Sequence, residues 1–334
     1  MPLRLLVLLA VALSSLATTA AEPPKQIQAV RIAETGGTDV LKLESIDVPQ
    51  PGEGEILVRV RAAGVNPVDA KMRASGAFLG EDRMPFTLGF DVSGTVVAVG
   101  DGVESFTEGD DILAMLDLRR GGGYAEYAIV KPSEAAKKPE SLSFEQAAGV
   151  PLVALTAHQA LFEHAKLKAG ETVLIHGGSG GVGSHAVQLA KAAGATVIAT
   201  ASDRNQDYLK KLGADVCVDY RSQNFEDVAK DVDVVLDTVG GDTQKRSFDV
   251  LREGGRLVSI VGLPHRELAE PAGVAAIGFL VRPDGGQLAT IAAMFDGGKL
   301  QPAALETLPL ADAPKAHEQI ETGHTRGKLV LVTE

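Results

Sequence analysis

The sequence has very little cysteine. Cys217 is the only one in 334 residues, so the chain can form no internal disulfide and no four-cysteine zinc lobe. It stands in the apolar stretch 214–218, which is typical of a short buried strand. We therefore expect Cys217 to be an inert core thiol.

Clusters of basic residues are also missing. The chain has 32 Lys and Arg against 44 Asp and Glu, a formal net charge of −12. Because nucleic-acid phosphates need clustered Lys and Arg, we expect no nucleic-acid partner. The 45% apolar and 23% charged residues are typical of an ordinary globular protein, and the length suggests two domains of roughly 100–200 residues each.

Long apolar runs are absent from the chain after its N-terminal segment. No run there approaches the ~20 residues of a membrane-spanning helix. At the N-terminus, Arg4 precedes an apolar run over 5–13 and small residues over 17–21. These are the three parts of a secretory signal peptide. We expect a signal peptide over residues 1–21 and a periplasmic or secreted protein; the alternatives are an uncleaved anchor or, if this interpretation is wrong, a cytoplasmic protein.

Residues 27–150 combine alternating apolar patterns with turn residues. Residues 56–61 alternate apolar with basic side chains, as in a half-buried strand, and further short strands are expected at 92–99, 112–115 and 124–130. The pattern predicts a compact, mainly β domain.

The rhythm changes at residue 151. Apolar runs near 173, 196, 215, 233 and 256 alternate with helix-like stretches, which predicts βαβ units and a parallel sheet with helices on both faces over residues 151–299. A final strand-like run follows at 327–332. We expect residues from about 300 to 334 to complete the first domain, although the pattern alone leaves their pairing open.

A glycine motif lies between the first strand and the first helix of the predicted α/β domain. Gly178, Gly180 and Gly183 fit G-x-G-x-x-G in the context that a dinucleotide site requires. We expect Gly178 to permit the tight turn, Gly180 to let backbone N–H groups reach a pyrophosphate, and Gly183 to let the helix pack on the strand. The sequence thus predicts a Rossmann domain, whose cofactor-binding loop comprises Gly178, Ser179, Gly180, Gly181, Val182 and Gly183.

The end of the next strand bears on the choice of nucleotide. NAD sites usually place an acid about 20 residues beyond the loop. Ser202 takes that place here, which leaves room for a 2′-phosphate that Arg204 could pair with. These residues favour NADPH; the alternative is that Asp203 binds the ribose and Arg204 is only solvated.

Histidine is missing from the first domain, since all seven histidines lie at position 158 or later. A catalytic zinc normally takes His, Cys and carboxylate ligands, so we expect no catalytic metal there. Hydride transfer to an isolated carbonyl puts charge on one oxygen and calls for a Lewis acid or a proton donor. A conjugated carbonyl or a quinone gives a delocalised anion, so a metal-free site favours these substrates.

Several motifs resemble a known family. They are residues 64–69, 89–94 and 109–111, the glycine loop and the ending 326–330. In order and spacing they are similar to the zinc-independent quinone oxidoreductase branch of the medium-chain dehydrogenase/reductase superfamily, and especially to NADP-dependent enone and alkenal reductases. Zinc-dependent alcohol dehydrogenases have a cysteine ligand where Asn66 stands and Gly-His-Glu at residues 89–91.

The resemblance implies a GroES-like first domain, a Rossmann second domain, a cofactor cleft between them and a homodimer. It implies that Asn66 approaches the nicotinamide ribose or the substrate, and that Thr156 lies near the nicotinamide. The other residues that it implies for the cofactor are Tyr220 beside the 2′-phosphate, Val239 and Val261 after later strands, and Lys328.

Alternatives remain for several of these residues and for the function. Asn66 could shape a turn before Pro67, Tyr220 could cap a strand, and Lys328 could be solvated. Asp69 and Asp91 are expected to be structural hydrogen-bonding groups, and we assign no proton donor. The alternative function is a nucleotide-binding protein with little turnover, in a structural or redox-sensing role; a zinc alcohol dehydrogenase is a third possibility.

Overall fold

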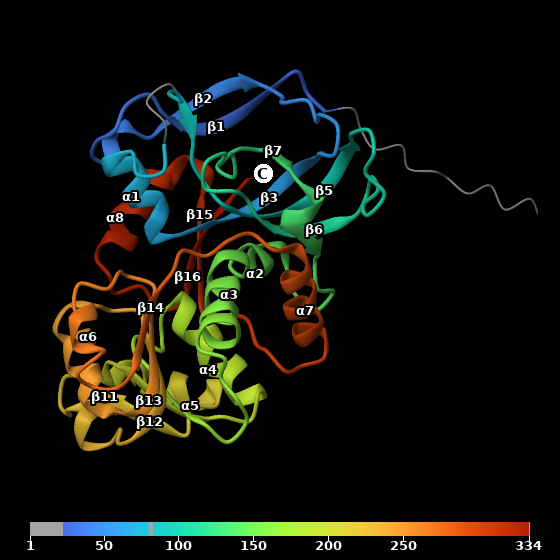
Figure 1. Ribbon diagram of the computed structural model, residues 1–334. Helices are drawn as coiled ribbons and strands as arrows, with labels where there is room; N and C mark the ends of the chain where they lie inside the picture. The colour runs from blue at the N-terminus through green and yellow to red at the C-terminus, as the bar shows by residue number, and fades with distance from the viewer. Residues whose placement is uncertain (1–22, 80–82, 334) are drawn as a thin grey trace, which may run out of the picture.

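The computed structural model describes residues 23–79 and 83–333. The expected signal peptide over residues 1–21 lies outside these residues. In the described part no helix is both long and apolar enough to cross a bilayer. Figure 1 shows the described chain as two domains, a mainly β part above and a parallel-sheet part below.

The first domain contains a three-stranded and a seven-stranded sheet. The small sheet has the order β2-β1-β4, and the large one has the order β15-β16-β3-β5-β6-β8, with β7 paired to β3. The strands are β1 (Gln26–Ile32), β2 (Lys42–Asp47), β3 (Ile56–Val65), β4 (Phe86–Thr87), β5 (Asp91–Val99), β6 (Asp111–Met115), β7 (Tyr127–Val130), β8 (Ala135–Lys137), β15 (Leu305–Pro309) and β16 (Lys328–Val332).

Strand β3 is the centre of the large sheet. Its Arg59 and Arg61 are exposed, whereas Val58 and Val60, which precede each of them, are buried, so the alternation in the sequence does place one face on the core. β3 pairs antiparallel with β5 on one side and with β16 on the other. The end of the chain therefore adds to the sheet of the first domain.

The second domain is a six-stranded parallel sheet of order β11-β10-β9-β12-β13-β14. Its strand order reverses between β9 and β12, and ligands of such sheets bind beyond the carboxyl ends of the strands at the reversal. The strands are β9 (Thr172–Ile175), β10 (Thr196–Ala201), β11 (Val216–Asp219), β12 (Val232–Asp237), β13 (Leu251–Ser259) and β14 (Ala275–Gly278).

Helices cover the sheets and fill the junction of the domains. They are α1 (Pro67–Ser75), α2 (Phe144–Ala148), α3 (Pro151–His158), α4 (Gly181–Ala192), α5 (Gln206–Leu212), α6 (Gly241–Ser247), α7 (Gly285–Asp296) and α8 (Ala313–Glu321). A π-helical segment, Gln159–His164, continues α3. The 3₁₀ turns are Thr38–Val40, Pro132–Glu134, Asp203–Asn205, Phe225–Asp227, Phe248–Val250, Arg266–Leu268 and Leu310–Asp312.

Helix α7 comes from the range that the sequence pattern assigned to the second domain, yet it packs on β8 of the first domain and on α3 (Figure 1). The hydrophobic core is correspondingly continuous: one cluster includes Val58 of β3, Leu155 of α3 and Val197 of β10. The two domains thus share a packed junction.

The place of β16 in the sheet predicts the effect of a core truncation. Leu331 is fully buried and pairs with Ala63 of β3. We expect Leu331→Ala to lower the free energy of unfolding by about 2–5 kcal/mol, measured by urea-induced unfolding. The control Leu43→Ala removes a side chain that is 46% exposed and should change it by less than about 0.5 kcal/mol. Equal effects of the two substitutions would contradict the packing described for β16.

Candidate active site

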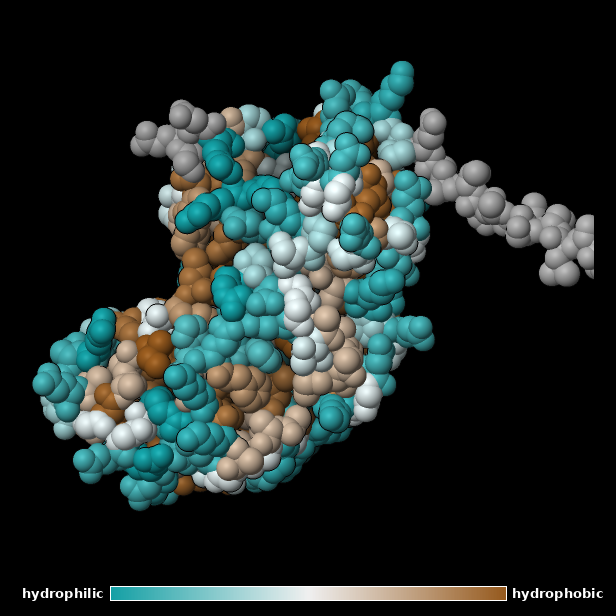
Figure 2. Space-filling model, turned by 45° about the vertical axis from the view of Figure 1, so that its right-hand side comes forward, coloured by the Kyte–Doolittle hydropathy of each residue, from teal (hydrophilic) through white to brown (hydrophobic). Residues whose placement is uncertain are grey.

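A cleft of about 940 Å³ runs between the two domains and receives residues from both. Its size is that of a site for a cofactor together with a small ligand. Figure 2 shows the molecule hollowed on the side where the domains meet, with hydrophobic residues along the recess.

The charge of the cleft is opposite to that of the chain as a whole. The basic residues that line it are Lys71, Arg204, Arg246 and Lys328, and none of its described lining residues is Asp or Glu. The whole chain carries a net charge of −12. Lys328 is paired with Asp91 and Arg246 with Glu226, so Lys71 and Arg204 are the two lining cations without an acidic partner among the described residues. Unpaired cations in a concave site favour an anionic ligand such as a dinucleotide.

The glycine loop borders this cleft at the N-terminus of α4. It follows β9 directly, and α4 begins at Gly181 with Gly180 as its N-cap. A Cβ on Gly180 would meet the carbonyl oxygen of Gly177 at 3.4 Å, an ordinary van der Waals contact, so the backbone is not crowded at this position. Helix N–H groups and their partial positive charge are thus available to a diphosphate, as the sequence predicted.

The roles of the individual glycines differ in part from those expected. The left-handed turn belongs to Gly177, with φ +67°. A Cβ on Gly178 would lie 2.9 Å from Leu209 and 3.0 Å from Ala199, so Gly178 is required by packing of the loop on β10 and α5. Gly183 packs on the backbone of Gly177 and Gly178, the close helix–strand contact expected of it. Ser179, Gly181 and Val182 also line the cleft.

The end of β10 carries the residues on which the choice between NADPH and NADH depends. Ser202 and Arg204 line the cleft, whereas Asp203 between them is exposed and is not part of the lining. An Arg204 guanidinium N–H donates to the carbonyl of His324 at 3.3 Å, so this side chain bridges from the second domain to the loop before β16.

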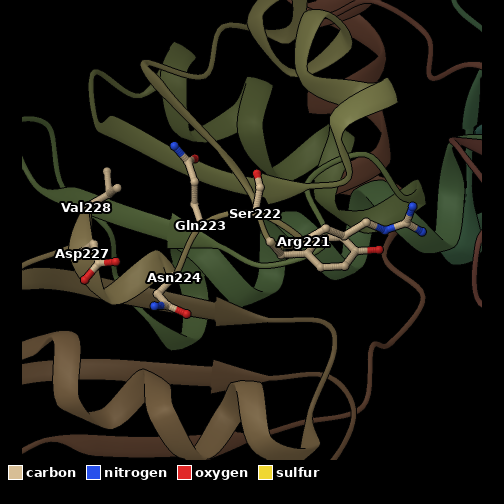
Figure 3. A pocket seen from close by; sticks show the side chains of 7 residues that line it. Arg221, Ser222, Gln223, Asn224, Asp227 and Val228 are labelled. Carbon is tan, nitrogen blue, oxygen red and sulfur yellow. The ribbon is translucent and has the colours of Figure 1, made fainter.

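Tyr220 stands half-exposed beside this corner. The guanidinium of Arg221 lies 5.8 Å from its ring centre. Both residues belong to a side pocket of about 340 Å³, and Figure 3 shows Arg221 directed away from Asp227 and Val228. A second basic side chain is therefore within reach of a phosphate near Tyr220.

Asn66 lies fully buried in the floor of the cleft. Its amide NH2 donates to Asp91 Oδ2 at 2.9 Å and its Oδ1 accepts from Lys328 Nζ at 2.6 Å. A carboxylate only accepts and an ammonium only donates, so the two opposite charges fix the orientation of the amide. One N–H of Asn66 stays free of these two bonds.

Lys328 is also buried in this floor. Its ammonium donates to the carbonyl of Val65 at 2.9 Å and lies 3.6 Å from Asp91 Oδ2. Asp91 Oδ1 accepts the N–H of Leu152 at 2.7 Å, at the start of α3. Burial raises the pKa of Asp91 and lowers that of Lys328, and each charge offsets this effect on the other.

Asp69 organises the turn that carries Asn66. It accepts the N–H of Asn66 at 2.7 Å and that of Gly89 at 3.1 Å. Burial raises the pKa of Asp69 to about 7. Asp69 and Asp91 therefore act through hydrogen bonds to backbone and side chains of the floor.

The remaining expected residues also border the cleft. Thr156 lines it while its hydroxyl donates to the carbonyl of Leu152 at 2.6 Å. Val239 and Val261 line it with exposed side chains, beyond the ends of β12 and β13. The cleft thus brings together the site residues proposed from the sequence with one exception, Gly178, which is packed against Leu209 and Ala199 and does not line it.

The sequence analysis missed several lining residues. Lys71 projects from the second turn of α1, and Arg246 comes from α6. A signal for Lys71 was present in the sequence. Pro67 marks the start of a helix, and Lys71 therefore lies about one helical turn beyond Asn66. The apolar lining residues Phe78, Leu118, Phe279, Leu280 and Val281 lie in segments without a motif.

Family profiles match both domains. Residues 52–140 match the alcohol dehydrogenase GroES-like domain, and residues 212–331 match a family described as zinc-binding dehydrogenase. Among the described residues, no group of three or more His, Cys, Asp and Glu side chains is arranged to hold a metal ion.

Whole-chain relatives agree with these matches. The chain is 37% identical over 326 residues to the chloroplastic NADPH-dependent alkenal/one oxidoreductase of Arabidopsis thaliana, covering 94% of this chain and 81% of the relative. It is 34% identical to the quinone oxidoreductase of Homo sapiens, covering 92% and 98%.

A solved structure shares the fold. The quinone oxidoreductase from Coxiella burnetii superimposes with a TM-score of 0.85 at 37% identity, covering 93% of this chain and all of that one. The predicted fold class, a GroES-like domain with a Rossmann domain, and the family resemblance are both confirmed. The chain belongs to the quinone oxidoreductase and alkenal reductase branch of the medium-chain dehydrogenase/reductase superfamily.

Proposed function

We propose that this protein is an NADPH-dependent oxidoreductase that reduces an α,β-unsaturated carbonyl or a quinone without a metal. The observation that carries the proposal is the cleft itself, whose lining combines the glycine loop, several apolar side chains and two cations, Lys71 and Arg204, that have no acidic partner among the described residues. The names of the relatives from Arabidopsis thaliana and Homo sapiens support the same chemistry.

The residues of the cleft fit NADPH. The backbone around Gly180 leaves the space that a diphosphate needs, and Ser202 with Arg204 leaves a small hydroxyl and a cation for the 2′-phosphate. Tyr220 lines both the cleft and the side pocket that contains Arg221, and Thr156 and Asn66 also line the cleft. When bound, the cofactor supplies a hydride.

Stabilising negative charge on the substrate oxygen falls to the chain's own side chains. Lys71 lines the cleft, and its ammonium has no hydrogen-bond or ion-pair partner among the described residues. A free cation at this place can donate to an enolate or phenolate oxygen. Asn66 keeps one N–H in a fixed direction, because Asp91 and Lys328 hold its amide.

The test is the loss of nicotinamide absorbance when the purified protein is mixed with NADPH and a panel of enones, enals and quinones. We expect turnover that chelators leave unchanged. Lys71→Met should lower kcat/KM about a hundredfold with the Kd for NADPH unchanged, and Lys299→Met, an exposed lysine outside the cleft, should have no effect. Nucleotide binding without turnover would favour the binding-protein alternative, and inhibition by chelators would favour a zinc enzyme.

Nucleotide preference has its own prediction. Ser202→Asp puts a carboxylate where a 2′-phosphate would lie, so the KM for NADPH should rise about tenfold or more, roughly 1.4 kcal/mol of like-charge repulsion. The KM for NADH should stay the same or fall. Asp203→Asn, at an exposed neighbour outside the lining, is the matched control and should change neither constant. A larger effect of Asp203→Asn would favour ribose binding by Asp203.

We further propose that residues 1–21 direct export and that the protein forms a homodimer. Its partner is then a small-molecule substrate, and it has no nucleic-acid partner. The leader pattern supports export, and β14 at the edge of the parallel sheet offers unpaired backbone to a second copy. Export would separate the enzyme from cytoplasmic NADPH, so the reductant would have to be supplied outside. Mass spectrometry of the mature N-terminus and sedimentation of the purified protein test both points; an intact Met1 or a monomer would contradict them.

A further inference from the structure

A short segment between β14 and α7 forms one side of the cleft without belonging to a helix or strand. We call residues 279–284 the strap. Its first three residues, Phe279, Leu280 and Val281, are consecutive lining residues of the cleft. Leu280 is 54% exposed, an apolar side chain that only a ligand or another chain can cover.

Gln159 holds the backbone of the strap. This side chain is 1% exposed; its amide NH2 donates to the carbonyl of Arg282 at 2.9 Å, and its Oε1 accepts the N–H of Arg282 at 3.1 Å. One side-chain amide thus satisfies both backbone groups of a residue that no strand or helix satisfies. Loss of both bonds would leave these polar groups without their partner and release the strap.

The other fastenings of the strap come from the same π-helical segment. The ring of His164 packs on that of Phe279 with 4.4 Å between centroids and a tilt of 38°, and the guanidinium of Arg282 donates to Glu163 at 2.8 Å. The segment continues α3, so Gln159 lies one turn beyond Thr156 on the same helix face. The strap therefore takes its position from the helix that lines the cleft, and π-helical turns are frequent at such sites.

The first domain also contributes apolar side chains to the cleft. Phe78 and Leu118 of the first domain line it, and Phe78 is 48% exposed. Lys71, from the same domain, also belongs to this lining. An apolar slot with one free ammonium fits a ligand that has a carbonyl oxygen and a hydrophobic substituent.

We propose that Gln159 is a positioning residue that fixes the strap as an apolar wall, and that this wall selects substrates carrying an aryl or alkyl substituent over small polar ones. The inference rests on the proposed function, since it names the class of enone or quinone that the same site takes. Gln159 then affects substrate selectivity indirectly, through its hydrogen bonds to the backbone of the strap.

The chain offers a matched control. Gln188 of α4 is 6% exposed and makes the same pair of bonds to the backbone of Gln301, at 3.1 Å and 2.7 Å. Neither Gln188 nor Gln301 lines the cleft. Each glutamine also makes a third bond, from Gln159 to Gln287 Oε1 at 3.0 Å and from Gln188 to the carbonyl of Ser184 at 3.1 Å. Methionine has nearly the volume of glutamine and no amide, so Gln159→Met and Gln188→Met each remove three bonds, two of them a matching pair to backbone, with little change in packing.

The experiment compares kcat/KM for benzylideneacetone and methyl vinyl ketone. We expect the wild type to favour benzylideneacetone by about tenfold or more, and Leu280→Ala and Gln159→Met to lower this ratio about tenfold. Gln188→Met should leave the ratio unchanged. Hydrogen exchange should accelerate in residues 279–284 for Gln159→Met and around Gln301 for Gln188→Met, which shows that each pair of bonds was lost.

Three results would overturn the inference: no preference for the aryl ketone, a ratio unchanged in Gln159→Met despite faster exchange of the strap, or an equal loss of preference in Gln188→Met. Turnover of no substrate at all would instead defeat the proposed function. In that case calorimetry of benzylideneacetone with the NADP⁺ complex still decides the wall, because a Kd unaffected by Leu280→Ala would exclude it.

Discussion

The buried ion pair of Lys328 and Asp91 is the constraint on which the junction of the domains depends. A charge removed from water is costly unless it is paired and hydrogen-bonded. Here one ammonium meets a carbonyl of β3, the amide of Asn66 and the carboxylate that begins β5. The same carboxylate holds the first turn of α3. The need to satisfy two charges thus determines how four elements meet beneath the cleft.

This arrangement separates two uses of basic side chains. Lys328 is fully engaged below the floor, whereas Lys71 and Arg204 stand in the cleft itself. The first kind of cation fixes an amide and a helix start, and the second kind is available to phosphate or to a substrate oxygen. The described acidic residues do not line the cleft, and Asp69 and Asp91 are buried beneath it. A chain with a net charge of −12 can therefore still offer a locally positive site.

Local patterns in the sequence carried much of this fold. The alternation in β3 and the glycine loop between a strand and a helix depend on near neighbours, and both were placed correctly, as was the family to which their motifs are similar. Contacts between distant residues could not be obtained in this way. Lys328 and Asn66 are 262 positions apart, and nothing in their spacing indicates that they meet. Tertiary packing also decides three further features that the sequence did not reveal. They are the packing of α7 on β8, the left-handed turn at Gly177 in place of Gly178, and the hydrogen bonds from Gln159 to the strap.

The end of the chain reaches the nucleotide loop directly. The N–H of Gly327 donates to the carbonyl of Ser179 at 3.0 Å, one residue before Lys328 enters the floor and begins β16. The last strand therefore connects the glycine loop of the second domain to the seven-stranded sheet of the first. Carboxypeptidase trimming into β16, or a fusion partner that pulls on it, would disturb this loop and so weaken coenzyme binding.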